Sequence, residues 1–120
     1  MIAIIFEVVP KSDGRQAYLD AAASLRSQLE ASDGFVSVER FESLTQPGKL
    51  LSLSFWRDEE AVRRWRSLGE HRLVQKAGRE RIFADYRLRV ASVDRDYGMF
   101  ERAGAPRDSK AIHDAPARPL

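Results

Sequence analysis

The stretch LLSLSFWRDEEAVRRWRSLGEHRLVQKAGRERIFADYRLRV, residues 50–90, decides the fold of this chain. Its hydrophobic pattern predicts a strand over residues 50–56, two helical segments after it, and a closing strand that follows Ile82. Both tryptophans and one of the two histidines of the chain lie inside this stretch. These side chains are well suited to line a pocket, so the same stretch holds the first candidates for a functional site.

The predicted strand over residues 50–56 has two different faces. One face carries only large apolar side chains and therefore requires a dry neighbour. The other combines small hydroxyl side chains with a tryptophan, which leaves room either for a cavity or for closely packed helices. The apolar face comprises Leu51, Leu53 and Phe55, and the second face comprises Ser52, Ser54 and Trp56.

An aspartate marks the start of the first helical segment. The carboxylate of Asp58 can accept a hydrogen bond from the free N–H groups of a first helical turn, and two glutamates follow it. Leu68 and Gly69 are expected to break this helix, and a second short segment carrying His71 is expected to end at Gly78. The apolar stripe of the first segment comprises Ala61, Val62 and Trp65.

The remaining elements complete a β-α-β-β-α-β order. The pattern predicts a strand over residues 2–9, a helix that starts after residues 12–14 and runs to about Ala31, a strand over 35–43 and a turn over 45–48. This order is typical of the α+β, ferredoxin-like fold, a four-stranded antiparallel sheet with both helices on one face. The first strand is apolar on both faces, so a second copy of the chain is the simplest cover for the face without helices.

Composition excludes several classes of function. The chain of 120 residues has 20 basic and 18 acidic side chains, a net charge of +2, and no cysteine. Because acidic residues are interleaved with basic ones, we expect no nucleic-acid binding, and the absence of an apolar run of ~20 residues excludes a membrane-spanning helix. The lack of cysteine fits a reducing compartment, and we expect a cytoplasmic protein. Two distant histidines give no metal-ligand spacing.

The sequence divides into a domain over residues 1–97 and a C-terminal tail over 98–120. The tail is rich in alanine, proline, arginine and aspartate and has no apolar periodicity. Alone it would be disordered. We expect it to lie across a subunit surface with three apolar anchors, Met99, Phe100 and Ile112.

Four stretches together carry a resemblance to a known family. They are IAIIFEV at 2–8, DGF at 33–35, SLSFW at 52–56 and EEAVRRWRS…HR from Glu59 to Arg72. Over residues 1–97 the chain resembles the antibiotic biosynthesis monooxygenase (ABM) superfamily. The resemblance implies a homodimer whose sheets pack face to face as a dimeric α+β barrel, and a pocket between sheet and helices in each subunit. The apolar face of residues 50–56 would then meet the partner.

Site residues can be transferred from this family only position by position. In the quinone-forming members, an asparagine four residues before the strand tryptophan holds the substrate; here the tryptophan is Trp56, and the asparagine position is Ser52. In the haem-degrading members, the helix tryptophan corresponds to Trp65, but the strand asparagine position is Ile4. The haem-ligand position falls near Val74 or Gln75. His71 resembles a histidine that many uncharacterised members carry.

The candidate site follows from these comparisons of residues. We predict His71 and Trp56 as catalytic residues, with no metal and no cofactor, although a packing role is the alternative for each side chain. The predicted substrate-binding residues are Ser52, Trp65, Phe6 and Tyr86.

Three arginines on the predicted strands could face either solvent or the pocket. We expect Arg40, Arg87 and Arg89 on solvated strand faces, paired with Glu39 or Glu42 across the strands. One of these arginines inside the pocket would instead indicate an anionic or carbonyl substrate.

The sequence thus predicts a cofactor-independent monooxygenase of the ABM type that acts on a small aromatic or quinol-like molecule. One alternative is a non-catalytic small-molecule-binding or stress-response dimer, and a weaker one is haem binding or degradation. No Ser-His-Asp arrangement, phosphate-binding glycine loop or pair of catalytic carboxylates supports a hydrolase, a kinase or a dinucleotide enzyme.

Overall fold

Four strands form one antiparallel sheet in the order β2-β3-β1-β4. The computed structural model describes residues 1–114, with the side chains at positions 69, 70 and 73 left out. The predicted ferredoxin-like α+β fold is confirmed. The strands are β1 (Ile2–Pro10), β2 (Phe35–Glu42), β3 (Leu50–Trp56) and β4 (Phe83–Ser92). The helices are α1 (Arg15–Glu30), α2 (Glu59–Arg66), α3 (Gly69–Ala77), the π-helical turn η1 (Gly78–Ile82) and α4 (Arg107–His113).

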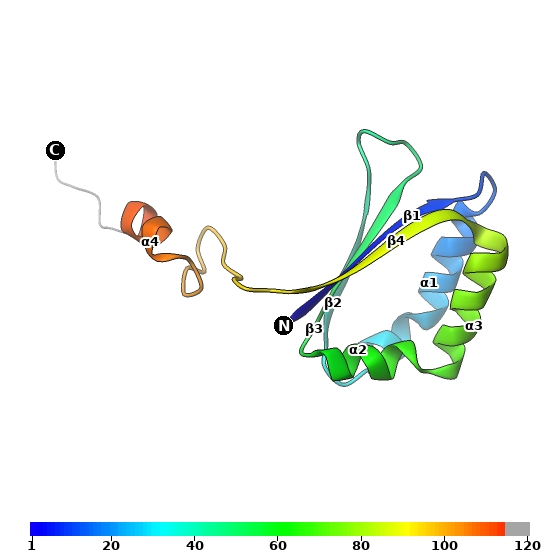
Figure 1. Cartoon of the computed structure of the whole chain (residues 1–120), viewed down its shortest axis with the longest axis horizontal. Helices are drawn as coiled ribbons and strands as arrows, with labels where there is room; N and C mark the ends of the chain where they lie inside the picture. The colour runs from blue at the N-terminus through cyan, green and yellow to red at the C-terminus, as the bar shows by residue number, and fades with distance from the viewer. Residues whose placement is uncertain (115–120) are drawn as a thin grey trace.

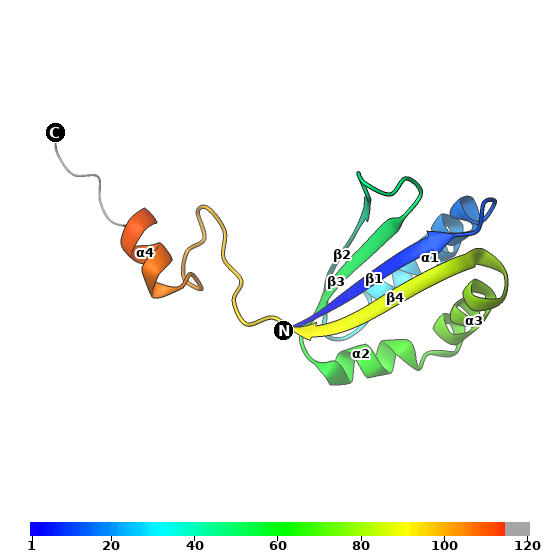
Figure 2. The same ribbon diagram turned by 45° about the horizontal axis from the view of Figure 1, so that its top comes forward.

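The register of the ladders separates the two faces of the sheet. On β1, Phe6 lies opposite Ser52 of β3 and Leu88 of β4, and these three side chains share one face. The neighbouring residue on β1, Ile5, lies opposite Leu53, and both of these side chains belong to the other face. Figures 1 and 2 show α1, α2 and α3 on the same side of the sheet. No helix of the described residues lies over the opposite face.

The core lies between the sheet and the three helices. Trp56, at the end of β3, is only 2% exposed and is the largest fully buried side chain. It packs with apolar side chains from the first two helices: Leu25 and Leu29 of α1, and Ala61, Val62 and Trp65 of α2. The three α2 residues are the apolar stripe that helical spacing predicted. Burial of these large side chains is the main free-energy source for docking helices on the sheet.

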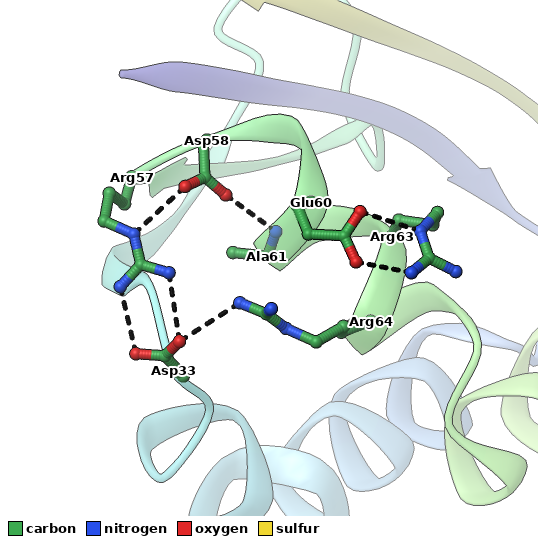
Figure 3. Close-up of polar contacts among 7 residues, drawn as sticks. All are labelled: Asp33, Arg57, Asp58, Glu60, Ala61, Arg63 and Arg64. Carbon is green, nitrogen blue, oxygen red and sulfur yellow. Dashed lines mark hydrogen bonds and ion pairs between the residues drawn. The ribbon is translucent and has the colours of Figure 1, made fainter.

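The predicted start of α2 is confirmed at Asp58. Its Oδ1 accepts a hydrogen bond of 2.9 Å from the backbone N–H of Ala61, and Arg57 donates to its other oxygen at 3.1 Å. Arg57 also forms a two-pronged ion pair with Asp33, with both distances 3.0 Å, and Arg64 adds a third bond at 3.1 Å (Figure 3). The hydrogen bonds from Arg57 are the main reason why the pKa of Asp33 is lowered. This network joins the corner after β3 to the turn before β2.

The α-helix α3 ends at Gly78, its C-cap, as predicted, but the chain does not leave the helical path there. The backbone of Gly78 stays right-handed, with φ −59° and ψ −50°, and continues as η1 to Ile82. The glycine also has a packing role, because a Cβ at this position would lie 2.6 Å from the ring of Phe83. Its small size lets the aromatic ring that opens β4 approach the helix backbone. A π-helical turn in such a place is often next to a functional site.

The C-terminal segment leaves the body of the molecule after β4 (Figure 1). It has local structure that the sequence did not predict, centred on Arg102, which donates to Asp114 at 2.9 Å and to the carbonyl of Gly98 at 3.1 Å. The short helix α4 follows within it. The predicted anchors Met99, Phe100 and Ile112 are all strongly exposed. Their contact with a second subunit stays a prediction, and residues 115–120 of the predicted tail lie outside the described part.

Two glycines with the same backbone angle allow a matched stability test. Gly34 and Gly48 both have φ +86°, a conformation that costs an alanine about 1 kcal/mol. A Cβ on Gly34 would also lie 2.5 Å from the Cβ of Ala61, whereas one on Gly48 meets nothing within 4 Å. We expect Gly48→Ala to lower the free energy of unfolding in urea by about 1 kcal/mol and Gly34→Ala by about 2–4 kcal/mol. Equal losses would contradict the close packing of this turn on α2.

Candidate functional site

A cavity of about 380 Å³ lies between the helices and the face of the sheet that they cover. This volume is in the range of small-molecule sites, and most of the lining side chains are apolar or aromatic. The pattern of small hydroxyl side chains beside a tryptophan on β3 therefore corresponds to a cavity rather than to closely packed helices. All six predicted site residues line it: Phe6, Ser52, Trp56, Trp65, His71 and Tyr86. Their chemical roles stay predictions.

Trp56 forms a fixed wall of the cavity. Its indole N–H donates to the hydroxyl of Ser54 at 3.0 Å, and its ring contacts Phe35 and Trp65 with centroids 5.5 and 6.3 Å apart. The N–H group is thus already used within the protein. The hydroxyl of Ser52, two residues before Ser54 on β3, has no hydrogen-bond partner among the described side chains and is free to bind a ligand.

His71 is held by α2. Its ring stacks on Trp65 with centroids 4.8 Å apart, and its Nδ1 lies 3.2 Å from the backbone carbonyl oxygen of Trp65. Because a carbonyl oxygen can only accept, Nδ1 carries the proton in this hydrogen bond. Burial lowers the pKa of His71 below its usual 6.5, and this effect exceeds the opposite influence of the carbonyl. At neutral pH the ring is therefore uncharged, with the lone pair on Nε2 available as a base.

A second group of aromatic rings lines another part of the cavity. Phe6, in the middle of the sheet, has ring centroids 5.7 Å from those of Phe83 and Tyr86 and 6.3 Å from that of Tyr18 on α1. The rings are tilted or edge-on to one another, the usual arrangement of packed aromatic side chains. Such a wall favours a flat, apolar ligand. Tyr18, on the buried face of α1, is a cavity residue that the sequence did not single out.

Arg40 also lines the cavity, whereas its position on a strand predicted a solvated face. The prediction that it lies on a solvated face and pairs with Glu39 or Glu42 is wrong. Its Nε instead donates to the hydroxyl of Tyr18 at 3.4 Å, and Glu42 is bound by Arg15 at 2.8 Å. The register explains the position, since Arg40 lies opposite Ser52, on the face that the helices cover.

The predicted partner of Arg89 is also wrong. The Nη1 of Arg89 lies 3.4 Å from the Oε2 of Glu7, on the outer face of the sheet. The Nζ of Lys49 lies 3.4 Å from the same carboxylate oxygen. Lys49 is the main cause of the lowered pKa of Glu7. The outer face thus carries its own cross-strand ion pairs, which are separate from the cavity.

The residues at the haem-site positions do not fit iron. Ile4, Val74 and Gln75 line the cavity, but an aliphatic or amide side chain does not replace the histidine that ligates haem. Among residues 1–114, no three histidine, cysteine or carboxylate side chains gather in a way that could hold a metal ion. The helices of the same range are each too short or too polar to cross a bilayer.

Comparisons with a family model and with a named relative point to the same family. The family model described as antibiotic biosynthesis monooxygenase matches residues 1–77. Over 93 residues, 78% of this chain, the sequence is 46% identical to a protein of Pyricularia oryzae named jasmonate monooxygenase ABM. The chain spans only 43% of the length of that fungal relative. It is also 32% identical, over 93 residues, to an uncharacterised Bacillus subtilis protein, YqjZ, of which it covers 79%.

Solved structures with the same architecture are more distant in sequence. Rv0793 of Mycobacterium tuberculosis superposes with a TM-score of 0.72 at 20% identity, over 81% of this chain and 98% of that one. PA3566 of Pseudomonas aeruginosa gives a TM-score of 0.65 at 14% identity, over 77% and 92% of the two chains. At such identities these likenesses support the fold alone.

The state of His71 can be tested by its pH dependence. Because its folded pKa is lowered, the unfolded chain binds more protons, so His71 adds stability above pH 6.5 that is lost as the pH falls below 6.5. We expect a midpoint below 6.5 in an NMR titration of the ring. We also expect the wild type to lose more unfolding free energy than His71→Gln between pH 7.5 and 5.5. A midpoint at or above 6.5 would contradict the neutral base.

Proposed function

The chain belongs to the antibiotic biosynthesis monooxygenase family, and on that premise we propose that it is a cofactor-independent monooxygenase. Its substrate is a small aromatic or quinol-like molecule bound in the cavity between sheet and helices. The observation that carries this proposal is the pairing of a neutral histidine with an aromatic-lined cavity of about 380 Å³. The volume accommodates a molecule of a few fused rings.

His71 would act as the general base. Its Nε2 removes a proton from a substrate hydroxyl or from an activated C–H group, which leaves an electron-rich anion. The hydrogen bond from Nδ1 to the carbonyl of Trp65 stabilises the imidazolium that forms. Ser52, whose hydroxyl has no partner in the described chain, can donate to the oxygen on which the negative charge develops.

The substrate anion itself would reduce dioxygen. For a methylene group between aromatic rings, a new C–O bond forms, the O–O bond breaks, and the sum is CH₂ + O₂ → C=O + H₂O. The carbon supplies all four electrons that dioxygen takes up. Both substrate hydrogens end in water, one of them after its transfer through His71. This balance requires no additional reductant.

The name of the fungal relative adds a second substrate to test. That relative is named a jasmonate monooxygenase, and jasmonate is small enough for a cavity of this size. Hydroxylation of a C–H bond that is not activated puts one oxygen atom into the product and the other into water. It therefore requires two electrons from an external reductant. Assays with jasmonate accordingly contain ascorbate, whereas those with an anthrone do not.

We propose further that two copies pair through the outer faces of their sheets. None of the helices in the described part of the chain covers this face, and its central side chains Ile5, Leu51, Leu53 and Phe55 are half-exposed in a single chain. Ion pairs of Glu7 with Lys49 and Arg89 lie at the side of this apolar area and would form part of a polar rim. The exposed apolar residues of the tail, including Phe100, would add to the contact between subunits.

The dimer can be tested with one charge on this face. We expect Leu53→Glu to give the mass of one 13.6-kDa chain in sedimentation equilibrium, because it buries an unpaired carboxylate, whereas the wild type gives twice that mass. The control is Leu44→Glu, at a side chain of the β2–β3 loop that is 100% exposed. A wild-type monomer, or equal behaviour of the two variants, would contradict pairing through the sheets.

The catalytic proposal can be tested by oxygen uptake with anthrone. We expect turnover that persists with a chelator present and that falls about 10²- to 10⁴-fold in His71→Ala. The matched control is His113→Ala in α4, outside the cavity, which should keep full activity. Wild-type binding of anthrone without oxygen uptake would support the non-catalytic small-molecule-binding alternative instead. Uptake that His71→Ala leaves unchanged would remove His71 from the mechanism.

A further inference from the structure

We propose that the ligand of this cavity carries a carboxylate, which Arg40 binds. The inference rests on the proposed function only in taking the cavity as a small-molecule site, and it extends that function by naming the substrate class. Among small ring-containing molecules with an apolar body, it predicts that those bearing a carboxylate bind more tightly than their neutral counterparts.

The first observation is the charge of the lining. Three arginines line the cavity, Arg40, Arg66 and Arg79, whereas no aspartate or glutamate is among the described residues that line it. Two of them, Arg66 and Arg79, are exposed and lie at the rim, whereas Arg40 is half-buried. Cationic groups at a largely apolar cavity raise the local concentration of anions and disfavour cations.

The second observation is that Arg40 has no carboxylate partner among the side chains that the structure describes. Glu42, two positions along the same strand, is already bound by Arg15 at 2.8 Å. Glu39 lies opposite Leu53 in the ladder and therefore points to the outer face of the sheet. The Nε of Arg40 donates to Tyr18, so the two terminal nitrogens of the guanidinium remain available in the described chain. A partly buried guanidinium without a counterion is costly in free energy, and a bound anion would remove that cost.

The third observation is the set of donors around this guanidinium. The oxygen of Tyr18 accepts from Arg40 at 3.4 Å, so the hydroxyl proton of Tyr18 is free to point elsewhere. Ser52 lies directly opposite Arg40 in the β2–β3 ladder, and its hydroxyl is also free in the described part. A carboxylate can accept from the two terminal nitrogens of an arginine in parallel, and hydroxyl donors can complete its shell. Phosphate would also accept these bonds, but it would not use the apolar walls.

The alternative is that Arg40 only packs on the ring of Tyr18 and binds no ligand. The guanidinium carbon lies 5.8 Å from the centre of that ring, within the range of a weak cation–π contact. Such a role would affect folding or the shape of the cavity, and it would change the binding of neutral and anionic ligands alike. A matched acid and ester therefore separate the two roles.

The experiment measures binding of 1-naphthylacetate and of its methyl ester by titration calorimetry at pH 7.5. Quenching of Trp56 and Trp65, both cavity residues, provides a second readout. We expect the wild type to bind the acid at least about 10-fold more tightly than the ester. Arg40→Gln should weaken acid binding about 10- to 100-fold and change ester binding less than about 3-fold, because only the acid uses the charged hydrogen bonds.

Controls make each outcome decisive. Arg95→Gln, at an exposed position that does not line the cavity, should weaken acid binding less than about 3-fold, and the thermal unfolding of both variants should match the wild type. Equal wild-type binding of acid and ester, or equal losses for both compounds in Arg40→Gln, would overturn the role of Arg40 and leave the proposed small-molecule site standing. Binding of neither compound would count against both proposals.

Discussion

The indole of Trp56 is the contact on which the site depends. This side chain is 2% exposed at the end of β3, where it fills the space between the sheet and α2. The side chains two and four positions earlier on the same face, Ser54 and Ser52, are small. A large side chain beside small ones thus supports the helix at one end of the layer and leaves a hollow next to it. The bond from the indole N–H to Ser54 fixes the ring that forms the wall.

The end of α2 holds the ring of His71 in place. The last carbonyls of a helix lack partners within the helix, and that of Trp65 accepts from the backbone of Leu68 at 3.1 Å and from Nδ1 of His71 at 3.2 Å. Trp65, which packs on Trp56, thus both stacks on the histidine and selects its tautomer. Burial keeps the pKa of the ring low. The histidine that we propose as the base is therefore positioned by the same aromatic contacts that hold α2 on the sheet.

The features that the sequence predicted well are those that depend on neighbours along the chain. The alternation on β3, the cap at Asp58 and the stripe of α2 are local patterns, and the family resemblance brought His71 and Ser52 into the candidate site. The place of Arg40 and the packing role of Gly78 were not predicted, because the surroundings of both residues come from elsewhere in the chain. The face on which Arg40 lies depends on the register of β2 against β3. The role of Gly78 depends on the ring of Phe83, which packs on it.

The charges of the cavity fit the proposed order of events. When His71 accepts a proton, the cavity gains a cation while the substrate becomes an anion. Lining arginines stabilise the substrate anion but disfavour a protonated His71, as Arg72 on the same helix also does. A carboxylate held by Arg40 would offset one of those cations without accepting the proton itself, because its own pKa is far lower. An acidic substrate would thus supply part of the electrostatic balance that its own deprotonation requires.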